Sequence, residues 1–443
     1  MIIDKLKDKK IVILGFGREG KSSLSYIRKY LPNQLIAIAD DNIENIKIED
    51  KNVCKCSKNY INELDEYDII LKSPGIPVKN HKYDAVLDKI SSQTDLFIEE
   101  YSNQIVGVTG TKGKSTTSSL IYHVLKKSGI DTILAGNIGI PVFDIIDDIH
   151  KDTVIILELS SHQLEFVHAS PRIGLLLNIY EEHLDHYDSF VDYQNCKKNI
   201  FKHMNKDDLL IYNIENDYLK YSEIEHIKNI KISNNPLLNC PVYVADKIIH
   251  YNGKLLDLNG KNIKLLGDHN YLNILFAYVV SKQLGLSDVQ FISALEDFNP
   301  LPHRMEYIGQ SKSGNKFYND SISTIPEATI KAIESIDNIK TVIIGGMDRG
   351  INYKKLINFI PNSSIENVIL LPDSGLRIKK DLDNVPNSKK LILASNMEEA
   401  VNIADKITKN GGVLLSPAAA SYGVYKNFEE RGNHFKECFN KLK

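Results

Sequence analysis

A glycine- and hydroxyl-rich run at residues 110–116 carries the clearest chemical signal in this chain. It follows the apolar stretch 105–108, so a strand should lead into a turn and then into a helix. Such a junction leaves backbone N–H groups free at the start of the helix, where they can hold a polyphosphate. The run therefore predicts ATP binding by Gly110, Thr111, Lys112, Gly113, Lys114, Ser115 and Thr116, with the Ser115 hydroxyl reaching a bound Mg²⁺.

The match to the pattern G-x-x-x-x-G-K-[ST] is incomplete, because Val108 stands five residues before Gly113. Apolar residues from Leu120 to Leu125 recur at helical spacing and favour the expected helix. A surface turn with a chance lysine is the alternative interpretation. The order of glycines, lysine and hydroxyls disfavours it.

Two later segments place polar side chains directly after apolar strands. Glu158 ends the apolar run 154–157, at the position where P-loop proteins hold Mg²⁺ directly or through water. Segment 178–187 contains two histidines and three carboxylates, a mixture that suits a divalent metal. A solvated strand end for Glu158 and ordinary surface polarity for His183 remain the alternatives.

The first forty residues predict a nucleotide-binding unit. The apolar run 11–14 precedes the pattern G-x-G-x-x-G at residues 15–20, and a helix should extend to about Tyr30. A second strand at 35–39 ends at Asp40, whose carboxylate could accept a hydrogen bond from a ribose hydroxyl or a base. A tight turn that packs a helix on a strand is the alternative.

Strand and helix signals alternate along the whole chain, which predicts an α/β fold with parallel sheets in three domains. We expect these domains at residues 1–96, 97–299 and 300–443. The expected later strands are 105–108, 132–135, 154–157, 173–177, 316–318, 341–344, 367–371, 391–394 and 413–415. Asn-Gly pairs at 252–253 and 259–260 favour type I′ turns, so a small antiparallel piece should lie around 242–266.

Three strand-end loops in the last region are rich in small and polar residues. They are residues 319–321, 345–350 and 416–421, and together they predict one shared cleft.

Composition narrows the functional classes. The 443 residues are 42% hydrophobic and 25% charged, with a net charge of −3, which favours neither nucleic acid nor a membrane surface as partner. The five scattered cysteines favour reduced thiols in the cytoplasm. The beginning of the sequence lacks a secretory pattern, and no apolar run reaches membrane-spanning length.

Spaced motifs along essentially the whole chain resemble the Mur ligase family. They lie at residues 110–116, 135–139, 158–163, 182–187, 267–273, 301–304, 319–321 and 426–433. Residues 15–20, Asp40 and Ser73-Pro74-Gly75 are most similar to members that add D-glutamate to UDP-N-acetylmuramoyl-L-alanine in cytoplasmic peptidoglycan precursor synthesis. The resemblance implies a Rossmann-like UDP-binding domain, a central P-loop ATPase-like domain and a Rossmann-like C-terminal domain.

The resemblance also implies a reaction, in which ATP converts a substrate carboxylate into an acyl phosphate that an amino group then attacks. It implies catalytic or metal-binding roles for Lys114, Ser115, Glu158, His183 and Lys197, the last as a carbamate, with two Mg²⁺ ions. It assigns ATP contacts to Asn270, Arg304 and Asp320. Acceptor contacts fall to Arg18, Glu19, Asp40, Gly75, Asn137, Ser160 and Gln163, and contacts to glutamate fall to Thr324, Arg349, Ser421 and Phe428. The implied partners are small molecules only, and the implied state is a monomer.

The chain departs from the family at a few positions. Ile322 stands where the family often has a lysine near the glutamate, Arg349 stands where lysine is common, and Asp268 replaces a frequent glutamine. Arg18 and Glu19 replace small or apolar residues. Ile322 in particular leaves open L-glutamate or another acidic amino acid as the substrate. Three further functions compete with this interpretation: a folylpolyglutamate-synthetase-like ligase, a non-enzymatic nucleotide sensor and, least favoured, an NAD dehydrogenase.

Overall fold

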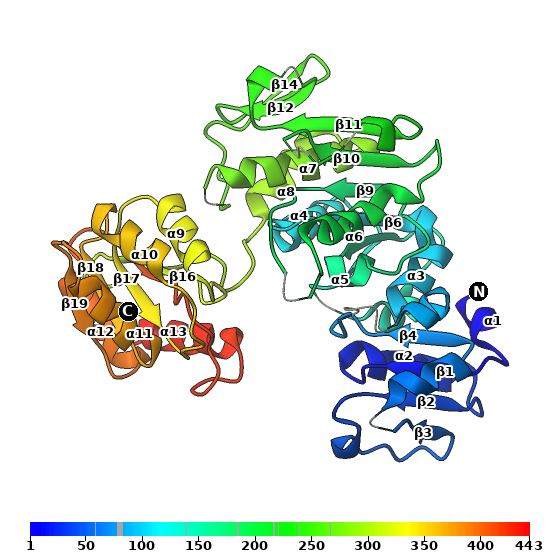
Figure 1. The fold of residues 1–443 in the computed structure, drawn as a ribbon. Helices are drawn as coiled ribbons and strands as arrows, with labels where there is room; N and C mark the ends of the chain where they lie inside the picture. Colours follow the sequence, from blue (N-terminus) through cyan, green and yellow to red (C-terminus); the bar gives the residue numbers. More distant parts are fainter. Residues whose placement is uncertain are drawn as a thin grey trace. The chain divides into compact units, whose positions relative to one another are not determined.

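A computed structural model describes residues 1–57, 59–77, 83–138, 140–183, 186–215, 218–219, 221–238, 240–265 and 267–443. Contacts divide the chain into two compact units. The first contains Met1–Asn262 and Tyr271–Phe298, and the second contains Ile263–Asn270 and Asn299–Lys443. Three sheets with helices between their strands confirm the predicted α/β class (Figure 1).

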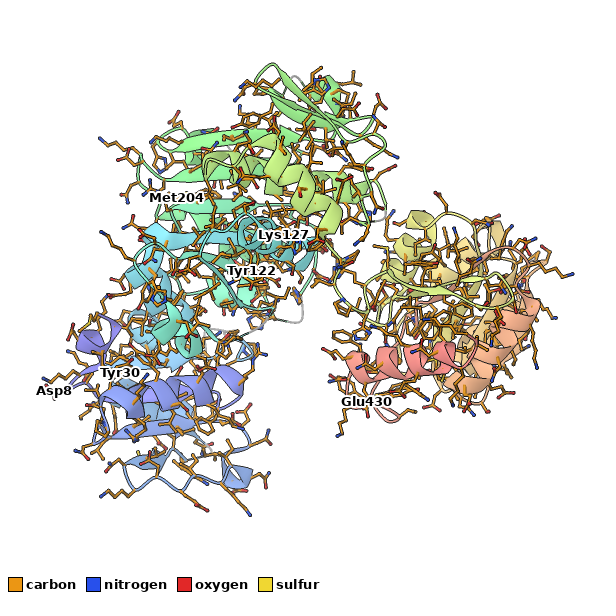
Figure 2. The ribbon with its side chains drawn as sticks, turned by 180° about the vertical axis from the view of Figure 1, so that it is seen from behind. Asp8, Tyr30, Tyr122, Lys127, Met204 and Glu430 are labelled. Carbon is orange, nitrogen blue, oxygen red and sulfur yellow. The ribbon has the colours of Figure 1, made fainter. Side chains whose placement is uncertain are left out.

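The first sheet belongs to the first unit and is parallel throughout, with the strand order β3-β2-β1-β4-β5. Its strands are β1 (Ile11–Leu14), β2 (Ile36–Ala39), β3 (Val53–Lys55), β4 (Ile69–Lys72) and β5 (Ile90–Ser91). Every residue of β1 and β2 is buried, as expected for parallel strands covered on both faces. Helix α1 (Ile2–Leu6) precedes the sheet, and α2 (Arg18–Tyr30) ends at the predicted Tyr30, labelled in Figure 2.

The second sheet also belongs to the first unit and has the order β14-β13-β12-β11-β10-β9-β6-β8-β7. The strands are β6 (Ile105–Thr109), β7 (Thr132–Gly136), β8 (Val154–Glu158), β9 (Ile173–Leu176), β10 (Leu209–Asn213), β11 (Lys228–Ser233), β12 (Val242–Ala245), β13 (Ile248–Tyr251) and β14 (Lys254–Asp257). The helices of this region are α3 (Gln93–Tyr101), α4 (Lys114–Lys127), α5 (Ser161–Leu164), α6 (Phe190–Lys202), α7 (His269–Gln283) and α8 (Asp288–Asp297). The predicted strands are confirmed within a residue at each end, whereas β10 and β11 were not predicted.

The antiparallel piece is formed by β12, β13 and β14. Asn252-Gly253 makes the predicted turn, with φ values of 49° and 82°, between the paired residues Tyr251 and Lys254. The turn between β12 and β13 instead uses Asp246-Lys247, with φ values of 48° and 62°. The second expected hairpin was wrong, because Asn259-Gly260 follows β14 and no strand follows it before 265; Leu266 lies outside the described residues.

The third sheet belongs to the second unit and has the order β15-β16-β20-β17-β18-β19, parallel except for the β15–β16 pair. Its strands are β15 (Glu306–Gln310), β16 (Lys316–Asn319), β17 (Ile339–Gly345), β18 (Asn367–Leu371), β19 (Lys390–Leu393) and β20 (Gly412–Leu415). Its helices are α9 (Pro326–Ser335), α10 (Lys354–Phe359), α11 (Ser374–Asp383), α12 (Met397–Ile407) and α13 (Phe428–Asn440).

Alternate residues of the third sheet enter two separate cores. Val342 and Ile344 pack in one hydrophobic cluster, whereas the intervening Ile343 packs in the other with Val413. Helices therefore cover both faces of this sheet. Among the described residues, every helix is too short or too polar to cross a lipid bilayer.

Candidate active site

The predicted phosphate loop lies between β6 and α4, which begins at Lys114. Gly113 caps the helix with a φ of +86°, and a Cβ atom there would lie 2.7 Å from Oδ1 of Asn273. The ammonium group of Lys114 donates to the carbonyl groups of Gly110 (2.9 Å) and Thr111 (3.2 Å). The strand–turn–helix arrangement that phosphate binding needs is therefore present.

The segment after β9 holds this loop in place. Thr111 N–H donates to the carbonyl of Asn178 at 2.8 Å. The Asn178 side chain accepts from Lys112 N–H at 2.8 Å and donates to the Lys112 carbonyl at 3.0 Å. The Lys112 ammonium pairs with Glu182 at 2.7 Å. Hydrogen bonds and an ion pair thus connect the P-loop to the segment that carries His183.

Glu158 ends β8 and is fully buried. Its Oε1 accepts a 2.7 Å hydrogen bond from Nδ2 of Asn137, which follows the neighbouring strand β7. Its Oε2 is buried and has no hydrogen-bond partner among the described residues. A buried carboxylate oxygen without a partner is costly, and a bound cation would compensate it. The site chemistry therefore fits a divalent metal at Glu158.

Lys197 on α6 lies directly behind the P-loop. Its side chain is buried, donates to the Gly110 carbonyl at 2.9 Å and lies 4.8 Å from the ring centre of Tyr193. Burial, together with the nearby charge of Lys114, lowers the pKa of Lys197 well below its ordinary value. The neutral amine is therefore far more accessible here than at an exposed lysine.

Three histidine rings gather beside Glu158's strand end. The His162 ring lies 4.9 Å from that of His183 and 4.1 Å from that of His186, edge-on in both pairs. Burial, followed by the charges of His186 and His183, lowers the pKa of His162 to about 3, so this ring stays neutral. Among the described residues, no group of three or more His, Cys, Asp or Glu side chains is arranged around a common metal position. Asp185, part of the predicted cluster, lies outside the described residues.

The carboxyl end of the first sheet carries several predicted acceptor contacts. Asp40 Oδ2 accepts from Phe16 N–H at 2.8 Å, so this carboxylate shapes the glycine-rich turn. Glu19 Oε1 accepts from Nε2 of Gln163 at 2.9 Å, and burial raises the pKa of Glu19. Ser160 and Gln163 form the capping box of α5. Glu19, Ser160 and Gln163 are therefore brought together, while Arg18 and Gly75 lie exposed.

The three strand-end loops of the second unit are joined by hydrogen bonds. Asp320, buried after β16, accepts from the Ser416 hydroxyl at 2.8 Å, and Gly345 N–H donates to the Pro417 carbonyl at 2.8 Å. Burial raises the pKa of Asp320 to about 6. The predicted residues of this unit are Asn270, Arg304, Asp320, Thr324, Arg349, Ser421 and Phe428; Arg349 is exposed and Ser421 is buried. The hydrogen bonds bring the three loops together, while the shared cleft stays a prediction.

Sequence reasoning gave no role to Arg431, which ties the same loops together. Its buried guanidinium donates to the Ser321 carbonyl at 2.8 Å and to the Ala419 carbonyl at 2.9 Å. Burial lowers its pKa to about 10. The sequence feature that could have pointed to Arg431 is its position within the 426–433 motif.

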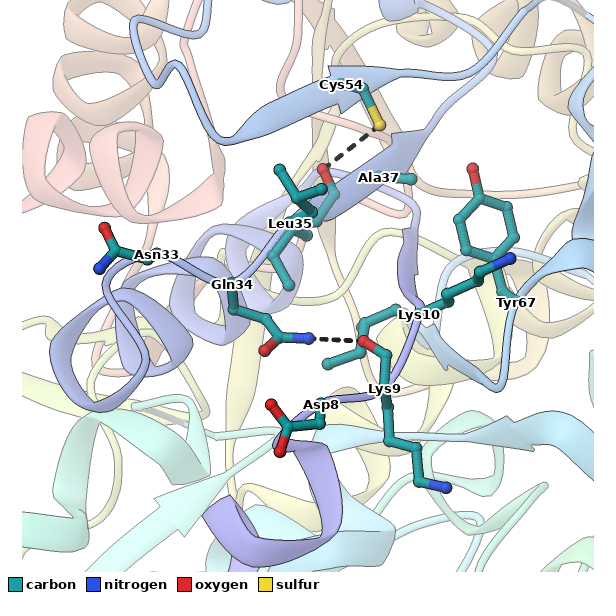
Figure 3. A pocket seen from close by; sticks show the side chains of 11 residues that line it. Asp8, Lys9, Lys10, Asn33, Gln34, Leu35, Ala37, Cys54 and Tyr67 are labelled. Carbon is teal, nitrogen blue, oxygen red and sulfur yellow. Dashed lines mark hydrogen bonds between the residues drawn. The ribbon is translucent and has the colours of Figure 1, made fainter.

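A hollow of about 400 Å³ lies at the opposite, amino-terminal edge of the first sheet (Figure 3). Gln34 donates to the Lys9 carbonyl there, and the Cys54 thiol lies against the Ile36 carbonyl. None of the predicted site residues lines it. The hollow is thus separate from the strand ends that carry the predicted site residues.

Comparison with known proteins decides the family. Residues 108–281 match the profile described as Mur ligase middle domain. The chain is 34% identical over 467 aligned residues to the UDP-N-acetylmuramoylalanine--D-glutamate ligase of Clostridium botulinum, covering 99% of this chain and 98% of that protein. The chain belongs to the Mur ligase family. A ligase of the same name from Clostridium kluyveri is 32% identical over 99% of this chain and 98% of its own length.

Solved Mur ligases share the fold. MurF ligase from Thermotoga maritima, crystallised with ADP, aligns with a TM-score of 0.61 at 18% identity, covering 99% of this chain and 97% of that one. UDP-N-acetylmuramate-alanine ligase MurC from the same organism aligns with a TM-score of 0.59 at 19% identity, covering 98% and 100%. These structures confirm the predicted Mur ligase fold class.

Proposed function

We propose that this Mur ligase joins D-glutamate to UDP-N-acetylmuramoyl-L-alanine with ATP as co-substrate. The observation that carries the proposal is the 34% identity over 99% of the chain to a ligase of that name. The strand–turn–helix arrangement at the P-loop and the parallel first sheet support it. The first sheet also argues against a folylpolyglutamate-synthetase-like ligase, because that alternative leaves it without a role.

The reaction proceeds in two transfers. The terminal carboxylate of the acceptor attacks the γ-phosphorus of ATP, the bond to ADP breaks, and an acyl phosphate forms. The amino group of glutamate then attacks the acyl carbon, the bond to phosphate breaks, and the amide forms with loss of a proton. Lys114 and the N–H groups at the start of α4 hold the ATP phosphates during the first transfer.

The residues that would hold Mg²⁺ are Ser115, Glu158, His183 and carbamylated Lys197. Bound Mg²⁺ would neutralise the charge that develops on the transferred phosphoryl group. Asn137 orients Glu158 by its 2.7 Å hydrogen bond, which leaves Oε2 for the cation.

Carbamylation of Lys197 is chemically accessible because its pKa is depressed. The neutral amine would attack CO₂, form an N–C bond and release one proton, which converts a buried neutral group into an anion. The contact with Gly110 keeps this group against the P-loop.

We place the acceptor at the carboxyl ends of the first sheet, with contacts from Arg18, Glu19, Asp40, Gly75, Asn137, Ser160 and Gln163. We place the nucleotide against Asn270, Arg304 and Asp320, and the incoming glutamate against Thr324, Arg349, Ser421 and Phe428. The three-domain boundaries, a cytoplasmic location and a monomeric state complete the proposal.

Product analysis tests the proposal directly. The protein is incubated with Mg-ATP, UDP-N-acetylmuramoyl-L-alanine and either D- or L-glutamate, and released phosphate and product mass are measured. We expect phosphate release and an added glutamate residue only with the D isomer. Turnover of L-glutamate alone would keep the protein a ligase and change its amino-acid substrate from D- to L-glutamate. Both isomers are tested because Ile322 stands where the family often has a lysine near the glutamate. Absence of turnover with both would contradict the proposal.

A further inference from the structure

A continuous series of side-chain contacts begins at the carboxyl end of the first sheet. Lys72, the last residue of β4, donates to Oε2 of Glu165 at 2.8 Å, with the two side chains only 2% and 9% exposed. The same oxygen lies 3.5 Å from Nε2 of His186. Burial raises the pKa of Glu165, but its contacts with His186 and Lys72 outweigh burial, and the net shift is downward. Glu165 is thus held as a carboxylate between two nitrogen groups.

The series continues from His186 to the phosphate loop. The His186 ring packs edge-on against His162 at 4.1 Å, and His162 packs against His183 at 4.9 Å. Backbone N–H of His186 donates to the His183 carbonyl at 2.9 Å. The His183 ring lies 5.9 Å from Tyr193, whose hydroxyl lies 2.8 Å from Oγ1 of Thr111.

The other end of the series lies next to the acceptor edge. Ser73 follows Lys72, and its hydroxyl donates to the Gly15 carbonyl in the glycine-rich turn at 2.7 Å. Lys72 is therefore one residue from a group that shapes the UDP-type turn. It is also in contact, through Glu165, with the segment that bears His183.

We propose that Lys72, Glu165 and His186 are positioning residues that fix His183 relative to the acceptor-binding edge of the first sheet. A buried ion pair adds little net stability over apolar side chains. Its two partners must nevertheless meet at hydrogen-bond distance, which holds the two segments that carry them in one relative position. Here one carboxylate oxygen is shared by a residue of the first sheet and a residue of the His183 segment. The inference rests on the proposed ligase function.

The variant His186→Phe tests it with little change in packing. Phenylalanine keeps an aromatic ring against His162 and removes the nitrogen that faces Glu165. We expect an unchanged melting temperature, an unchanged KM for ATP and a kcat about tenfold lower, because a small misplacement of a metal-side group slows phosphoryl transfer strongly.

A second variant removes the ion pair without leaving a lone buried charge. The double change Lys72→Met with Glu165→Met should fold, because neutralised buried pairs are well tolerated. Its kcat should also fall about tenfold. Lys72→Arg, which retains the charge, should keep most of the rate. The matched control is Lys89→Met with Asp65→Asn, an ion pair of the first sheet region that should leave kcat unchanged.

An activity-independent measurement separates this inference from the proposed function. The NMR ring signals of His183, observed with isotope-labelled histidine, should move in His186→Phe and in the double variant. Wild-type protein without ligase activity would overturn the proposed function, and the NMR result would still decide the positioning role. The inference would be overturned if both variants kept the wild-type ring signals of His183. It would also be overturned if the enzyme is active and both variants kept the wild-type kcat.

Discussion

Asn137 donates its amide hydrogen to one oxygen of Glu158 across 2.7 Å, while the other oxygen of Glu158 is buried with no hydrogen-bond partner among the described residues. The two residues follow neighbouring parallel strands, where Gly136 pairs with Glu158. A Cβ atom at Gly136 would lie 2.3 Å from the Glu158 carbonyl, so this close approach requires glycine. The arrangement leaves one carboxylate oxygen for the cation that we propose at this site.

Replacing Glu158 with glutamine should separate stability from activity. Glutamine retains an oxygen for Asn137 and removes a buried charge, so the melting temperature should stay the same or rise. Phosphate release should fall about 100-fold or more, because Mg²⁺ loses a ligand during phosphoryl transfer. Asp152→Asn, at an exposed carboxylate just before β8, serves as control. If Glu158→Gln retained its activity, the proposal that Glu158 binds Mg²⁺ would be wrong.

Lys114→Ala should abolish productive ATP binding without unfolding the protein. The ammonium group lies over the P-loop carbonyl groups, where it can reach a phosphate. We expect kcat/KM for ATP to fall about 100-fold or more. Lys126→Ala, on the exposed side of the last turn of the same helix, should have little effect. Equal rates for the two variants would contradict the assignment.

Two glycines in the left-handed region give a matched pair. Gly113 and Gly129 have φ values of +86° and +82°, but an added Cβ meets Asn273 only at Gly113. Gly129→Ala should cost about 1–2 kcal/mol of unfolding free energy and leave the rate unchanged. Gly113→Ala should add a steric clash and raise the KM for ATP. Denaturant titration measures the unfolding free energy, and steady-state kinetics measure the KM for ATP. If the two variants gave the same values in both experiments, the predicted role of Gly113 in the loop would be wrong.

Asp320 predicts a pH dependence of stability in the second unit. Burial raises its folded-state pKa to about 6 from an ordinary value of 3.8. The folded protein therefore binds more protons than the unfolded chain between these values, so its unfolding free energy falls as pH rises through that window, by about 3 kcal/mol. Asp320→Asn should remove this contribution. Denaturant unfolding at pH 4.5 and 7.0 measures it, with exposed Asp383→Asn as control; equal pH slopes for wild type and Asp320→Asn would contradict it.

Arg349→Ala should affect glutamate selectively. Its exposed guanidinium follows β17 at the place where we propose that glutamate binds, and it can bind a carboxylate in two-point contact. We expect the KM for glutamate to rise at least about tenfold, and the KM for ATP to stay within about twofold. Lys354→Ala, at the start of α10, is the control. A parallel rise in both KM values would point to a folding defect instead.

The sequence predicts many of the buried strands, because a continuous apolar run has few other solutions, although β10 was missed despite being buried at four of its five residues. The strand at 11–14 and the strand at 367–371 were predicted to the residue. Strand β11 was missed because four of its six residues are polar, which resembles a loop. The turn at Asp246-Lys247 was missed because both residues adopt positive φ without a glycine or asparagine to signal it.

The site was predictable where it depends on neighbouring strand ends. Asn137 and Glu158 meet because parallel strands place their carboxyl ends at one edge. The Lys72–Glu165 pair was not predictable, since 93 residues separate the partners and their contact depends on how two sheets dock. A motif describes neighbouring residues in the sequence, so it cannot predict a contact between residues this far apart.

The reciprocal bonds between Asn178 and Lys112 extend the pairing of β6 with β9 beyond the ends of both strands. The turn that we propose to surround the triphosphate is therefore held by hydrogen bonds in the nucleotide-free protein. Binding then requires little ordering of the chain, so more of the contact energy is available as affinity. The Thr111 and Lys112 amides should accordingly resist hydrogen exchange even in nucleotide-free protein.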